Sequence, residues 1–84
     1  MQAGTKVKVR LLESKDSREV RRSRGIPDSC GETFEGQLVI DVKAGEVLWV
    51  DNSLRTTTIQ AIDPVAPGVF DIKTQNSLYE LTLV

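Results

Sequence analysis

The sequence predicts an all-β fold in a single domain that covers residues 1–84. Two observations support this prediction. Short segments that alternate apolar and polar residues recur about every 8–12 residues, with turn-forming residues between them. One long polar segment, residues 14–33, follows the first of these strands and holds almost no residue that could fill a core. A small SH3-like barrel of five or six antiparallel strands fits this order best, whereas an OB-like barrel usually has a helix after its third strand.

Residues 5–12 form the first predicted strand. Val7, Val9 and Leu11 alternate with basic residues, and this period of two predicts a half-buried strand with one apolar and one basic face. The basic positions are Lys6, Lys8 and Arg10. We therefore expect three cations in a row on the outer face of this strand.

Residues 14–33 are expected to form one long basic loop within the domain. Residues 15–25 hold five basic and two acidic residues, although the net charge of the whole chain is −1. Asp16 followed by Glu19 matches a weak helix-capping pattern and Gly25 could end a helix, so a short helix is one alternative within the loop. Loops of this length are uncommon, and most are functional or disordered.

Strand patterns return from Phe34 onward. The predicted strands cover residues 37–42, 46–51, 55–62, 69–74 and 77–84. Lys43–Gly45 and Asp51–Ser53 are expected to turn the chain between the first three of these strands, because glycine, asparagine and aspartate tolerate left-handed backbone. Pro64 and Pro67 mark a loop before the last hairpin.

The orientation of several side chains follows from this assignment. Ile59 should face one side of its strand and Thr56 the other. Gln75 and Asn76 should form a tight hairpin turn in which Asn76 adopts a positive φ. Across this hairpin the carboxylates of Asp71 and Glu80 are expected to lie opposite each other as ordinary surface charge.

Composition excludes several classes of chemistry. The chain has no histidine and a single cysteine, Cys30, which excludes histidine-dependent nucleophilic catalysis and an intramolecular disulfide. We therefore expect no enzymatic activity, no cofactor and no metal. No apolar run approaches the about 18–20 residues that span a bilayer, and the first residues lack the apolar core of a signal peptide. The expectation is a cytoplasmic protein that does not enter a membrane.

The main candidate site is a cluster of basic residues in and beside the predicted loop. Its members are Lys8, Arg10, Lys15, Arg18, Arg21, Arg22 and Arg24. Arginine suits an anionic partner because its planar guanidinium forms bidentate hydrogen bonds with carboxylates and phosphates. We interpret the cluster as a site for an acidic partner; the alternative is a solvated loop that only keeps the protein soluble.

An acidic protein is the expected partner, and two other classes remain as alternatives. Nucleic acid is a weaker candidate than an acidic protein, because the core is expected to take most of the aromatic residues and few remain to stack on bases. An oligomer that sequesters a small ligand between subunits is the third reading. Trp49 lies between Leu48 and Val50, which leaves two apolar strand faces and makes a homo-oligomer plausible. Trp49 and Tyr79 are candidate apolar anchors for a partner, with a structural role in the core as the alternative for each.

The segments 54–62 and 70–81 resemble the ends of small uncharacterised proteins of bacteria and their phages. Those proteins share an Arg-Thr-Ser/Thr step, here Arg55-Thr56-Thr57, and a terminal Thr-x-Asn-Ser-x-Tyr hairpin, here residues 74–79. The resemblance covers about a third of the chain and implies a bacterial or mobile-element setting, without an activity. The expected function is that of a non-enzymatic binding protein, and in that setting blocking a host protein, an anti-defence role, is a natural role by analogy.

Overall fold

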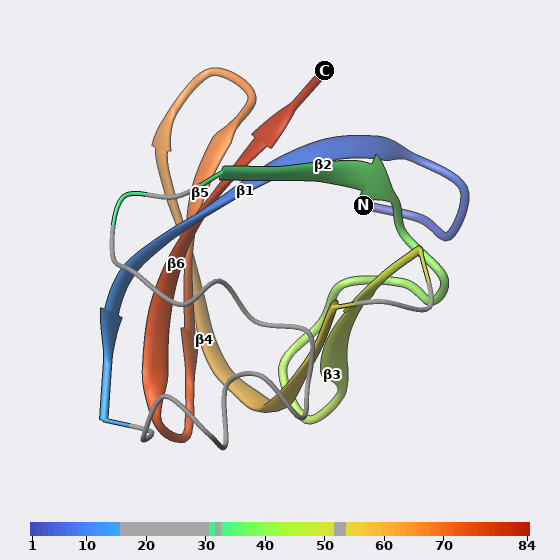
Figure 1. Cartoon of the computed structure of the whole chain (residues 1–84). Helices are drawn as coiled ribbons and strands as arrows, with labels where there is room; N and C mark the ends of the chain where they lie inside the picture. Colours follow the sequence, from blue (N-terminus) through green and yellow to red (C-terminus); the bar gives the residue numbers. More distant parts are fainter. Residues whose placement is uncertain (16–30, 32, 52–53) are drawn as a thin grey trace.

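The structure, a computed structural model, describes residues 1–15, 31, 33–51 and 54–84. The strands are β1 (Lys6–Ser14), β2 (Thr33–Gln37), β3 (Val47–Val50), β4 (Leu54–Ala66), β5 (Val69–Thr74) and β6 (Ser77–Leu83). All neighbouring strands are antiparallel, in the order β2-β1-β6-β5-β4-β3. Figure 1 shows the sheet curling until β3 approaches the end of β2. The predicted small all-β barrel is confirmed, and the described residues contain no helix.

A short set of contacts between β2 and β3 nearly closes the barrel. Leu38 and Val50 form an isolated antiparallel bridge, and the Asp51 backbone N–H donates to the Gln37 carbonyl at 2.9 Å. The Asp51 carboxylate accepts a second hydrogen bond from the Gln37 N–H at 2.8 Å. Gly36 is required here because a Cβ at this position would overlap the Asp51 carboxylate. The closure of the barrel between β2 and β3 therefore depends on a residue without a side chain at position 36 and on a turn at Asp51.

The apolar face of β1 forms one wall of the core. Val7, Val9 and Leu11 are at most 1% exposed, whereas the residues between them are exposed. The other buried apolar residues are Leu38, Val42, Leu48, Val50, Leu54, Ile59, Ile72, Tyr79 and Leu81. The predicted first strand and its two faces are confirmed.

The strand predicted over residues 37–42 is wrong. The strand that follows the long segment is Thr33–Gln37, and beyond the bridge at Leu38 the chain leaves the sheet. Val42 is still buried, because its backbone N–H donates to the Met1 carbonyl at 3.1 Å and its side chain packs into the core cluster. An apolar residue that plugs the end of a barrel from a loop has the same sequence pattern as a strand residue.

The loop predicted at Pro64 is also wrong, because β4 continues through it to Ala66. Proline is tolerated at sheet edges and bulges, and both conditions hold here. β3 pairs with β4 only over Leu54–Thr58, and the β4–β5 register shifts between Pro64 and Ala66. The turn that follows contains Gly68 at φ 73°. The predicted bounds of β5 are confirmed, as is the turn conformation of Asp51, at φ 53°.

Thr56 faces the core, which corrects the expected outward orientation. The β3–β4 register shifts between the pairs of Val47 and Trp49, so β4 carries one extra residue at this point. Thr56 is 5% exposed, and its Oγ1 accepts a hydrogen bond from the Leu48 N–H at 3.0 Å. The same hydroxyl donates to the Thr57 carbonyl at 2.8 Å. Its side chain therefore satisfies backbone groups that the bulge removes from the ladder.

Replacing Thr56 with valine should destabilise the protein although the shape of the side chain is nearly unchanged. The substitution leaves the buried Leu48 N–H without its acceptor, which costs about 1–3 kcal/mol. For a domain of this size, each kcal/mol lowers the melting temperature by roughly 4–8 °C. Thermal unfolding of Thr56→Val followed by circular dichroism measures the effect. Thr58→Val, an exposed threonine of the same strand, is the control; equal melting temperatures for the two variants would contradict the assigned role of Thr56.

Candidate partner-binding surface

The outer face of β1 carries a row of three cations, which we call the basic row: Lys6, Lys8 and Arg10. All three are exposed, because the alternate residues of the strand are in the core. β1 pairs with β2 on one side and with β6 on the other, so its backbone is held on both sides. The predicted exposure of Lys8 and Arg10 is confirmed, and both project from a strand rather than from a loop.

Acidic residues lie directly beside the basic row. Lys8 is paired with Glu35 of β2, and Arg10 is paired with Glu80 of β6. Side chains at such positions lie on the same face of the sheet, with their Cβ atoms about 4.5–5.5 Å apart. The basic row is therefore part of a mixed-charge surface and not a uniformly positive one.

A second row of charge crosses β4, β5 and β6 on the same outer face. Asp63 is paired with Asp71, and Asp71 is paired with Glu80. The expected opposition of Asp71 and Glu80 is confirmed. Asp63 was missed, because its position in the row depends on β4 continuing past residue 62 and on the register shift between Ile59 and Ala61. We call these three residues the acidic row; Glu80 is its point of contact with the basic row.

The arginines predicted to bind the partner lie outside the described residues. They are Arg18, Arg21, Arg22 and Arg24, and the short helix proposed as an alternative falls on the same segment. The structure does describe where the segment joins the barrel. The Lys15 N–H donates to the Asn76 carbonyl at 2.7 Å, and the Gly31 N–H donates to the Leu11 carbonyl at 2.7 Å. Lys15 directly follows β1, and its hydrogen bond to Asn76 places it next to the β5–β6 hairpin. Its side chain is exposed.

The two candidate apolar anchors have different environments. Trp49 is half-buried on the outer side of β3, while its neighbours Leu48 and Val50 are fully buried. The Arg55 guanidinium lies 5.1 Å from the centre of the indole ring, a cation–π contact between paired strands. Tyr79 is 0% exposed and belongs to the core, so its proposed role as an anchor is wrong and the structural alternative is confirmed.

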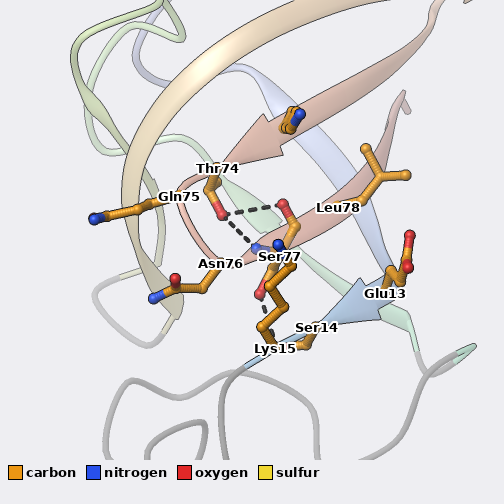
Figure 2. A pocket seen from close by; sticks show the side chains of 9 residues that line it. Glu13, Ser14, Lys15, Thr74, Gln75, Asn76, Ser77 and Leu78 are labelled. Carbon is orange, nitrogen blue, oxygen red and sulfur yellow. Dashed lines mark hydrogen bonds between the residues drawn. The ribbon is translucent and has the colours of Figure 1, made fainter.

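A cavity of about 380 Å³ lies between the end of β1 and the β5–β6 hairpin (Figure 2). The hairpin turn is held by Thr74, whose Oγ1 accepts from the Ser77 N–H and donates to the Ser77 carbonyl, both at 3.2 Å.

Asn76 does not have the positive φ that the sequence suggested. The physical reason is that the Thr74 side chain supplies hydrogen bonds to the turn, which therefore does not need a left-handed residue.

A second cavity, of about 450 Å³, lies near the start of β1 and is lined by Lys6, Glu35, Gly36 and Asp51 among others. Within the described part of the chain, no group of three or more histidine, cysteine, aspartate or glutamate residues is arranged to hold a metal ion. No helix among the described residues is long and apolar enough to cross a membrane.

Neutralising Asp71 should stabilise the protein, because this residue stands between two other carboxylates in the acidic row. Like charges directly opposite each other cost up to about 1 kcal/mol per pair, and partial exposure reduces this through solvent screening. We expect Asp71→Asn to raise the free energy of unfolding by a few tenths of a kcal/mol to about 1 kcal/mol at low salt, and by less at high salt. Urea unfolding at two salt concentrations measures this difference. Glu46→Gln, at an exposed turn residue outside the row, is the control, and an Asp71→Asn protein no more stable than this control would refute the repulsion.

No protein-family model matches the chain, and no curated protein or solved structure matches it either. The resemblance to small bacterial and phage proteins therefore stays a prediction. The features on which a function can be based are the charge rows of the outer face, the anchored ends of the arginine-rich segment and the cavity beside Lys15.

Proposed function

We propose that this protein is a non-enzymatic binding protein that engages the acidic surface of another protein. The binding surface combines the basic row of β1, Lys15 and the arginines of residues 18–24. The observation that supports this most is the exposure of Lys8 and Arg10 on a strand whose opposite face is completely buried. Cations on a strand held from both sides are positioned before the partner arrives, which lowers the entropy cost of binding.

The mixed charge of the outer face favours a protein over a nucleic acid. Glu35 and Glu80 are paired with Lys8 and Arg10, and they would repel a phosphate backbone at the positions where it would be bound. A protein surface can offer cations to these carboxylates and carboxylates to the basic row, and such complementarity gives specificity. Stacking on bases also has little support, because Tyr79 is buried and Trp49 is partly covered by Arg55.

The biological setting of the proposal comes from the resemblance described above. A small protein from a phage or another mobile element that binds an acidic host protein could block that protein by covering its surface. We propose such an anti-defence role in the bacterial cytoplasm. Under this proposal the partner's acidic surface is one that normally binds a basic protein only weakly or transiently, so that a rigid basic surface can compete for it.

The experiment that tests the binding surface is a pull-down from bacterial lysate with matched variants. We compare the wild type, Lys8→Ala with Arg10→Ala, and Arg18→Ala with Arg21→Ala and Arg22→Ala. Lys43→Ala, at an exposed lysine outside the basic row, is the control. We expect each multiple variant to recover at least tenfold less of a specific acidic protein, identified by mass spectrometry, than the control. Equal recovery by all variants would refute the proposed surface.

The nucleic-acid alternative is tested in parallel by fluorescence anisotropy with labelled DNA and RNA. Binding through about 4–6 phosphate contacts would weaken steeply between about 50 and 200 mM salt. We expect no such binding at micromolar protein. Tight, salt-dependent binding that is lost in the Lys8→Ala and Arg10→Ala variant would replace an acidic protein with nucleic acid as the partner.

A further inference from the structure

We infer that the cavity beside Lys15 is a subsite for a short acidic peptide segment, in which a carboxylate is followed by an apolar side chain. This inference rests on the proposed function, because it names which part of an acidic protein partner would be held and where. The cavity has a volume of about 380 Å³, which accommodates one or two side chains. Three features of its lining select this ligand: a fixed frame, an apolar floor and an excess of positive charge.

The frame of the cavity is held by hydrogen bonds that do not involve the ligand. Ser77 Oγ donates to Ser14 Oγ at 2.9 Å, and Thr74 Oγ1 bonds to both backbone groups of Ser77 (Figure 2). The Lys15 N–H is bonded to the Asn76 carbonyl at 2.7 Å. These contacts tie the end of β1 to the β5–β6 hairpin, so the two walls of the cavity keep their separation before a ligand enters.

The floor is formed by Leu78, a residue on the outer face of β6. Its strand neighbours Ser77 and Tyr79 are buried, and Leu78 is half-buried because it faces away from the core. Leu78 is paired with Lys73 on one side and with Glu13 on the other. In Figure 2 the side chains of Leu78 and Glu13 lie on the same side of the hairpin. An apolar side chain of the ligand can therefore cover Leu78 and remove its surface from water.

Charge determines the polar part of the ligand. Lys15 and Lys73 contribute two ammonium groups to the lining and Glu13 contributes one carboxylate, so the cavity favours an anion. An inorganic phosphate would use the lysines but would leave Leu78 uncovered. A segment such as Asp-Leu or Glu-Leu uses both features, and its backbone N–H groups can donate to Glu13. Lys15 is also the last described residue before the arginine-rich segment, which places the subsite within the proposed binding surface.

The test uses the full chain, labelled with ¹⁵N, and a peptide as the probe. We titrate acetyl-Asp-Leu-Glu-amide and follow the backbone amide resonances. The expected result is a saturable shift centred on Asn76, Ser77 and Leu78. Acetyl-Asn-Leu-Gln-amide, which has the same shape without charge, is expected to bind at least fivefold more weakly. Shifts of equal size with the two peptides, or shifts centred elsewhere, would overturn the inference.

Variants separate the contribution of the lysines from a general effect of charge. Lys15→Ala with Lys73→Ala is expected to weaken the acidic peptide at least fivefold, whereas Lys43→Ala, which does not line the cavity, is expected to leave its affinity unchanged. Melting temperatures measured beside the titrations show that each variant is folded. Equal weakening by Lys43→Ala and by the double variant would show non-specific attraction and would refute the subsite.

Two further comparisons distinguish a peptide from inorganic phosphate as the ligand, and the subsite from the larger proposed binding surface. Titration with inorganic phosphate is expected to give smaller shifts than the peptide at equal concentration; larger shifts would show a phosphate site and overturn the peptide assignment. The double lysine variant is then used in the pull-down. Loss of peptide binding with a matching fall in partner recovery supports the subsite. If recovery falls only when Lys8 and Arg10 are replaced, the subsite fails and the proposed binding surface stands.

Discussion

The structure depends on the pairing of β1 with strands on both of its sides. β1 joins β2, which follows the arginine-rich segment, to β6, the last strand among the described residues. Its apolar residues fill one wall of the core, and the same alternation leaves Lys8 and Arg10 exposed. The position of the cations is therefore a direct result of the requirement to bury Val7, Val9 and Leu11, since a strand cannot reverse one set of side chains without the other.

The charge on the outer face is arranged by register rather than by net charge. The chain has a net charge of only −1, but the pairing of β4, β5 and β6 brings Asp63, Asp71 and Glu80 into one row and places that row beside Arg10. Such a surface has a fixed order of charge across the sheet, from the acidic row to the basic row and then to Glu35 of β2. A partner that matches it must align in one orientation, which is how polar surfaces achieve specificity even where each ion pair contributes little.

Sequence patterns predicted those elements whose structure depends only on residues close together in the sequence. The alternation of β1 and the tight β5–β6 hairpin were predicted with bounds close to those observed. Thr56 was misjudged because an extra residue at a bulge changes which face a side chain occupies, and Pro64 because a strand can continue through a proline at a bulge. Of the acidic row, the Asp71–Glu80 pair was predicted, whereas Asp63 was missed because its pairing depends on the register shift in β4. The cavity beside Lys15 could not be predicted because it depends on the pairing of β1 with β6, which are distant in sequence.

The pairing of the first strand with the last has a consequence for how the protein folds during synthesis. Val7 is paired with Leu83, and Leu11 with Tyr79, so β1 obtains its second neighbour in the sheet only once β6 has been synthesised, whereas β2 is available much earlier. Contacts between such distant residues slow folding, typically into the range of milliseconds to seconds. Until then, β1 can pair on one side only, with β2, and its apolar side lacks the core residues Tyr79 and Leu81. A nascent polypeptide with such exposed apolar residues can bind chaperones. The three cations on the outer face of β1 would help to keep it soluble until β6 has paired.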